Sequence, residues 1–152
     1  MENKKTIPNN LFFASVEELI GEGRSVEMTV KGFSMRPFLR NGRDAAVLSP
    51  LPESGLKVGM VVLFRYGGKH ILHRLVRIES GKLTMEGDGN YRTSEVVAPE
   101  DVVAYTSEVE LMCGRRIKYN SCAWRWRSAV SLARKWARRV AVDLKHKISR
   151  EI

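Results

Sequence analysis

A serine and a histidine are the residues of this sequence whose types could do chemistry together. Ser34 lies in KGFSMRPFLRNGRD (residues 31–44), and His73 lies in HILHRLVRI (residues 70–78). A serine hydroxyl becomes an effective nucleophile when a neighbouring base removes its proton. Neutral imidazole suits that task, because the pKa of a histidine is ordinarily near ~6.5. The pair therefore fits nucleophilic catalysis, provided that the fold brings the two side chains together.

Each of the two residues also has a structural explanation when it is taken alone. Serine next to glycine and ahead of proline is typical of a turn, which fits Ser34. The alternation of apolar residues around His73 predicts a strand whose face it shares with Ile71 and Leu75, so it could be a core histidine with a single hydrogen-bond partner. Only their arrangement with other segments distinguishes chemistry from structure.

The elements that must position these residues can be predicted from apolar periodicity. Ser15 and Glu18 have the spacing of a capping box, and the apolar residues around them predict a short helix that ends before Gly21. Turn pairs at Gly67-Gly68 and Ser80-Gly81 predict hairpins between antiparallel strands. The predicted strands cover residues 25–32, 44–48, 60–66, 70–78, 82–87 and 100–112.

Composition and charge indicate one β domain with a basic appendage. The chain has 152 residues, of which 43% are hydrophobic, enough for one core. Residues 1–114 hold 14 Lys and Arg against 15 Asp and Glu, whereas residues 115–152 hold 12 against two. We therefore expect a mainly β domain over residues 1–114, with its N-terminal helix, and a basic amphipathic helix over residues 115–152.

The predicted C-terminal helix carries an apolar stripe. Its members recur at three- and four-residue spacing: Trp126, Val130, Ala133, Ala137, Val140, Leu144 and Ile148. One interpretation is that the stripe packs on the β domain or on the first helix, leaving a solvated basic face. The other is an interfacial helix that binds the anionic surface of a membrane. Nucleic acid fits less well, because no basic or aromatic platform continues into the rest of the domain.

Four segments in order resemble the signal peptidase I and LexA superfamily of serine peptidases. They are GFSMRPFLRNG (32–42), LKVGMVVLF (56–64), ILHRLV (71–76) and GDGN (87–90), and the resemblance runs from about Glu17 to about Val109. Within the superfamily, the chain is similar to the branch with a histidine base, because His73 stands where common bacterial signal peptidases have lysine. The resemblance implies an antiparallel coiled sheet as the fold.

The resemblance also implies roles for residues. Ser34 would be the nucleophile and His73 the general base. The backbone around Gly32, Ser34 and Met35 would bind substrate and the oxyanion. Asp88 matches an aspartate that is mostly structural in relatives, yet we group it with Ser34 and His73, because Thr93 and Ser94 stand where the orienting aspartate is expected. Asp88, Glu95 or no residue at all therefore remain as third member.

The implied activity is cleavage of a leader or precursor peptide by a Ser-His mechanism, with small residues preferred before the cut. A catalytically decayed module of the same fold that only binds peptides is the alternative. No cofactor is expected, and Cys113 and Cys122 are too far apart for a CxxC motif and have no histidines at metal-ligand spacing. The N-terminus lacks the apolar segment of a signal peptide and no apolar run reaches membrane-span length. We therefore expect a cytoplasmic protein, peripheral at the inner membrane if the C-terminal helix binds lipid.

Overall fold

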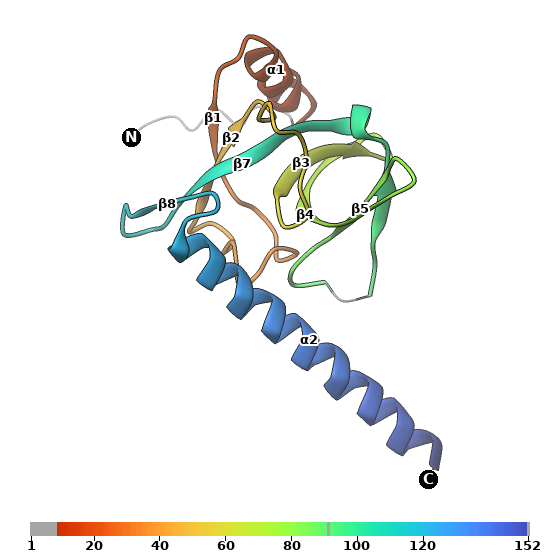
Figure 1. The fold of residues 1–152 in the computed structure, drawn as a ribbon. Coiled ribbons are helices and arrows are strands. Elements are labelled where there is room, and N and C mark those ends of the chain that lie inside the picture. Colours follow the sequence, from red (N-terminus) through yellow and green to blue (C-terminus); the bar gives the residue numbers. More distant parts are fainter. Residues whose placement is uncertain (1–8, 91, 152) are drawn as a thin grey trace.

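The computed structural model describes residues 9–90 and 92–151 of the chain, the last of these without its side chain. Its mainly antiparallel β sheet curls on itself, with a helix at each end of the chain (Figure 1). The helices are α1 (Asn9–Gly21) and α2 (Cys122–Glu151), with a short 3-10 helix at Pro99–Asp101. The strands are β1 (Val26–Thr29), β2 (Ala45–Ser49), β3 (Val61–Tyr66), β4 (Lys69–Glu79), β5 (Lys82–Glu86), β6 (Glu95–Val97), β7 (Val102–Glu110) and β8 (Arg116–Lys118).

The eight strands form one sheet in the order β1-β2-β7-β3-β4-β5-β6, with β8 paired to β7. All of these pairs are antiparallel. The predicted turns at Gly67-Gly68 and Ser80-Gly81 are confirmed as the links from β3 to β4 and from β4 to β5. Antiparallel neighbours joined by tight turns place His73 in the middle of the sheet, in β4 opposite Val62 of β3.

Two clusters of buried side chains hold the sheet together. The larger one packs α1, the Ser34 segment and the first residues of α2 against β2, β3 and β7, with Phe38, Leu39, Leu48 and Trp124 among its members. The second lies between β3, β4, β5 and β6, around Phe64 and Leu75. The Ser34 segment is thus an integral part of the main core.

Two predictions about helices are wrong in detail. Helix α1 begins at Asn9, so Ser15 lies inside it, and its hydroxyl donates to the carbonyl of Leu11 at 3.1 Å instead of capping the first turn. In α2, the alternative that the apolar stripe packs on the β domain or on α1 is wrong, because Trp126 remains 74% exposed and Leu144 55% exposed. The helix packs through its other face, as described below.

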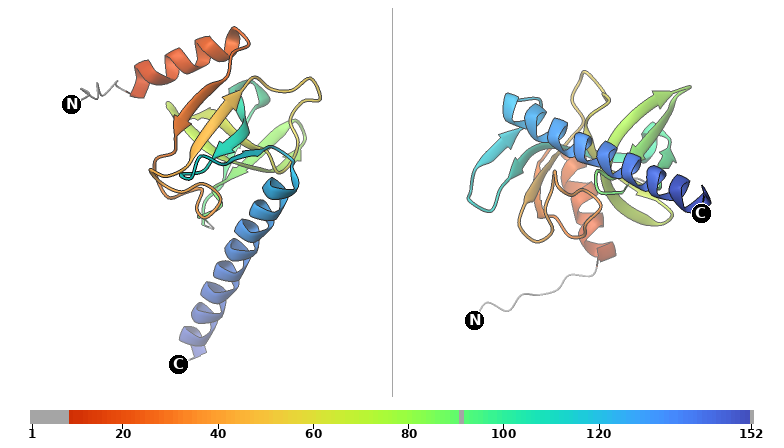
Figure 2. Two further views of the ribbon diagram at one scale, coloured as in Figure 1. Left: turned by 90° about the vertical axis from the view of Figure 1, so that its left-hand side faces the viewer. Right: turned by 90° about the horizontal axis from the view of Figure 1, so that it is seen from below.

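The second half of α2 projects away from the sheet (Figure 2). Among the described residues, no helix is both long and apolar enough to cross a membrane.

Candidate functional site

The segment that carries Ser34 is closed at its base and anchored by apolar side chains. The Gly42 N–H donates to the Val30 carbonyl at 2.8 Å, and the Val30 N–H donates to the Asp44 carbonyl at 3.0 Å. Three side chains of the segment are almost completely buried: Met35, Phe38 and Leu39. Ser34 itself is exposed. The result is a rigid loop that presents one hydroxyl to solvent.

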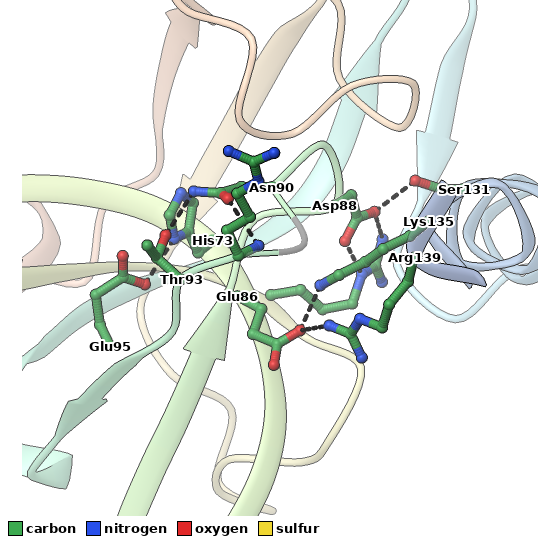
Figure 3. A network of polar contacts seen from close by, with 11 residues as sticks. His73, Glu86, Asp88, Asn90, Thr93, Glu95, Ser131, Lys135 and Arg139 are labelled. Carbon is green, nitrogen blue, oxygen red and sulfur yellow. Dashed lines mark hydrogen bonds and ion pairs between the residues drawn. The ribbon is translucent and has the colours of Figure 1, made fainter. Parts of the chain in front are cut away.

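His73 is held by a carboxylate at one ring nitrogen. Its Nδ1 lies 2.9 Å from Oε2 of Glu95, the first residue of β6 (Figure 3). Both side chains are largely buried, at 7% exposed for His73 and 12% for Glu95. A carboxylate accepts, so the neutral ring donates from Nδ1 and keeps a lone pair on Nε2. The contact fixes the tautomer and ring orientation that a general base needs.

Gly87 brings the histidine and the serine segment together. A Cβ atom placed on Gly87 would lie 2.4 Å from the Ser34 carbonyl oxygen and 3.1 Å from Nε2 of His73. In addition, the Gly89 N–H donates to the same carbonyl at 2.7 Å. Nε2 of His73 makes no hydrogen bond within the described part of the chain, and it lies with the Ser34 carbonyl beside Gly87, where a side chain would not fit. Among the described residues, no hydrogen bond reaches the Ser34 hydroxyl.

Asp88, which the sequence analysis groups with Ser34 and His73, binds different partners. Its two oxygens accept from Arg74, at 2.8 Å from Nε and at 2.7 Å from Nη2, and one also accepts from the hydroxyl of Ser131 at 2.7 Å. The Asp88 side chain is fully buried. The carboxylate that contacts His73 is therefore Glu95, and Asp88 neutralises a buried guanidinium on the other face of β4.

Backbone donors lie beside Ser34. The Gly32 N–H, expected as one oxyanion donor, already donates to Oδ1 of Asn41 at 2.9 Å. The N–H groups of Ser34 and Met35 have no acceptor within the described part of the chain. Gly32 has a φ of +94°, a conformation that side chains disfavour. Ser34 is exposed whereas Met35 is 2% exposed, so the Ser34 N–H is the better placed of the two to meet a ligand.

A shallow pocket of about 170 Å³ adjoins Ser34. Its lining is largely apolar: Val30, Lys31, Gly32, Ser34, Met35, His70, Ile71 and Leu72. This volume suits one small or medium side chain of an extended peptide. The histidine in this lining is His70, and His73 is not part of it. A larger hollow of about 520 Å³ lies at the Gly67-Gly68 hairpin, and its lining does not include Ser34.

His70, the other histidine of β4, contacts a different carboxylate, that of Glu17. Nε2 of His70 lies 2.6 Å from Oε1 of Glu17 in α1, and its ring stacks on Phe13 with centroids 4.5 Å apart. His70 thus fastens α1 to β4 at the edge of the pocket. Of the two, His73 is the histidine whose second nitrogen faces the serine segment.

Sequence analysis did not predict the polar network that joins α2 to β4 and to the end of β5. Lys135 and Arg139 pair with Glu86 (Figure 3). Ser128 accepts from Arg74 at 3.2 Å. The sequence gives little indication of these contacts, because polar residues on a long basic helix are usually solvated. The steps of three and four residues from Ser128 to Ser131 and from Ser131 to Lys135 define one helix face only after the helix is known to dock.

Comparison with protein-family models and with curated protein sequences finds no match for this chain. Its function is therefore inferred from the residues and geometry described above.

Proposed function

We propose that this protein is a serine endopeptidase of the signal-peptidase and LexA type. Ser34 is the nucleophile, His73 the general base and Glu95 the group that orients the base. The observation that carries the proposal is the two-sided setting of His73: Nδ1 is bound by Glu95, and Nε2 faces the Ser34 backbone beside Gly87. Glu95 replaces Asp88 as third member, because Asp88 pairs with Arg74.

The mechanism follows from these positions. A peptide bound in extended form presents its scissile carbonyl to Ser34, with the preceding side chain in the 170 Å³ pocket. Oγ attacks while Nε2 of His73 takes the proton, and the imidazolium is stabilised by Glu95. The N–H groups of Ser34 and Met35 donate to the oxyanion. His73 then returns its proton to the leaving amine, and water hydrolyses the acyl-enzyme by the same route.

The substrate class is a leader or precursor peptide made in the same compartment as the enzyme, which we expect to be the cytoplasm. The small, mostly apolar pocket supports a preference for a small apolar residue before the cut. Because Ser34 and the residues just before it, 31–33, are exposed, the protein can accept a strand of a separate polypeptide.

A peptide-binding module without catalysis is the second candidate. It is favoured by one observation, namely that the Ser34 hydroxyl makes no hydrogen bond to His73 among the described contacts. The peptidase requires Oγ and Nε2 to approach to about 3 Å once substrate is bound. The two candidates share the pocket and differ only in turnover.

The test is cleavage of a diverse peptide mixture, followed by mass spectrometry. Ser34→Ala and His73→Gln should each lower the cleavage rate by about 10³-fold or more, because nucleophile and base act as a unit. Ser54→Ala and His146→Gln are matched controls at exposed sites outside the pocket, and should keep the wild-type rate.

Cleavage that persists in a folded Ser34→Ala or His73→Gln variant would rule out the proposed mechanism. Peptides that bind at the pocket but are never cut by the wild-type protein would instead support the binding module.

A further inference from the structure

Helix α2 docks on the domain through a mainly polar face. Apart from Trp124, which is 3% exposed in the core, the buried docking residues are Ser131 and Lys135. Arg127 adds a hydrogen bond to the Phe38 carbonyl at 2.7 Å and an ion pair with Asp44 at 3.0 Å. These contacts, with those to Glu86 and Asp88, fix the rotation of the helix about its own axis.

The apolar stripe lies on the opposite side of the helix. At 100° per residue, its members fall roughly half a turn away from the line through Trp124, Ser131 and Lys135. The large side chains on this outer surface are exposed: Trp126 74%, Leu144 55% and Ile148 58%, with Trp136 at 68% toward its edge. A helix that docks by polar groups and leaves its apolar residues in solvent reverses the usual arrangement.

Basic residues border the stripe. Arg134 and Lys145 lie along one side of it and Lys147 on the other, while Arg138 lies further round, toward the docking face. Within residues 9–90 and 92–151, none of these four forms an ion pair. The exposed surface therefore combines apolar side chains, two tryptophans and positive charge, with the tryptophans in the first half of α2 and Leu144 and Ile148 in the second.

We propose that this surface of α2 binds an anionic lipid bilayer, with the helix lying in the headgroup region and the β domain held above it. Leu144 and Ile148 would enter the acyl boundary, Trp126 and Trp136 suit the headgroup level, and the flanking basic side chains reach lipid phosphates. This interaction surface is separate from the Ser34 site and does not depend on the peptidase proposal.

Charge complementarity favours lipid over the other occupants. Residues 122–152 hold nine Lys and Arg against two Asp and Glu, so two copies of α2 packed along their stripes would place like charges side by side. Nucleic acid would use the basic groups but leave the apolar stripe in water. An anionic bilayer satisfies both at once.

The test is co-sedimentation of the full chain with vesicles of phosphatidylcholine alone or with about one third phosphatidylglycerol, at low salt and at about 0.5 M salt. We expect binding only to the anionic vesicles and its loss at high salt. A stripe variant (Trp126→Gln, Leu144→Gln, Ile148→Gln) and a charge variant (Arg134→Gln, Arg138→Gln, Lys145→Gln, Lys147→Gln) should each lower the partition coefficient by about tenfold or more.

Two control variants change the same number of exposed residues on the β domain. They are Leu51→Gln, Val58→Gln, Met112→Gln, and Arg24→Gln, Arg43→Gln, Arg77→Gln, Lys82→Gln. Both should bind anionic vesicles as the wild type does. Because every substituted side chain is exposed, circular dichroism should show a folded protein in each case.

Three outcomes would overturn the proposal: binding that ignores lipid charge, binding that survives in the stripe variant, and no binding of the wild-type chain. Sedimentation velocity without lipid completes the test, since a dimer that dissociates in the stripe variant would identify a second copy as the occupant.

Discussion

Two neighbouring residues of β4 bind two different carboxylates. His73 contacts Glu95 on one face of the strand, and Arg74 binds Asp88 on the other. Because successive side chains of a strand point to opposite faces, one segment supports both the candidate site and the docking of α2. Removing the charge of Asp88 should therefore affect mainly stability, and removing that of Glu95 mainly turnover.

Asp88→Asn should mainly lower stability. Arg74 is 2% exposed, and its side chain would keep a buried charge without a counterion. Breaking such a pair costs about 3–5 kcal/mol, which urea unfolding can measure. Asp143→Asn, at an exposed position of α2, should change the free energy of unfolding by less than about 0.5 kcal/mol. A stable Asp88→Asn protein with a lost cleavage rate would return Asp88 to the catalytic group.

Glu95→Gln should mainly lower turnover, by about 10²-fold or more, because the imidazole loses the group that orients it. The cleavage rate of the folded Glu95→Gln protein is the readout. Glu53→Gln, an exposed loop change, should leave the rate unchanged. A full cleavage rate in Glu95→Gln would remove Glu95 from the mechanism.

Ser34 and His73 could be proposed from the sequence because their segments resemble ordered family motifs, and because strand periodicity fixes which residues share a face. Glu95 could not be selected over Asp88. Both carboxylates come after most of β5. Which of them reaches His73 depends on the connection from β5 to β6, and periodicity does not define its path.

At the scale of elements, the last residue of β5 and the three residues after it (86–89) connect several parts of the molecule. Glu86 and Asp88 bind α2, while Gly87 and Gly89 lie against the backbone of the Ser34 segment. Four residues thus connect the helix, the nucleophile segment and the base.

Gly87→Ala should disturb the contact between residues 86–89 and the Ser34 segment. Its Cβ would lie 2.4 Å from the Ser34 carbonyl oxygen, a backbone atom that has to move. Overpacking of this kind costs about 1–3 kcal/mol, and a displacement near 1 Å at a reacting group lowers turnover by about 10²-fold. Gly21→Ala is the control, since a Cβ there would meet nothing within 4 Å. Thermal unfolding and cleavage rates of both variants check the prediction, and a fully active Gly87→Ala enzyme would contradict it.

Strong strands and hairpins were predictable, whereas short elements were not. The six predicted strands each contain apolar residues either in a run or in alternation with polar ones, and all six are present. Strands β6 and β8 have three residues each, too few for a periodic signal, and exist because β5 and β7 offer free edges. The capping box at Ser15 was wrong because apolar residues before it, such as Phe12, pack on the core and extend α1 backwards.

At the scale of the whole molecule, α2 consists of a docked half and a projecting half. The hydrogen bonds and ion pairs that join it to the sheet extend from Arg127 to Arg139, on the described part of the chain. Beyond Arg139, the larger apolar side chains of the outer surface, Leu144 and Ile148, face solvent. Folding therefore depends on the first half, and the proposed lipid contact depends on both.

Ending the chain after Arg139 should separate these two contributions. All docking contacts named above remain, so we expect the free energy of unfolding to change by less than about 1 kcal/mol. Binding to anionic vesicles should fall by about tenfold or more, because Leu144, Ile148 and several basic residues are removed. Ending the chain after Ser121 is the comparison. It removes Trp124 from the core and leaves Arg74 and Asp88 without Ser128 and Ser131, so it should unfold far more easily. Equal destabilisation by both truncations would show that the projecting half also supports the fold.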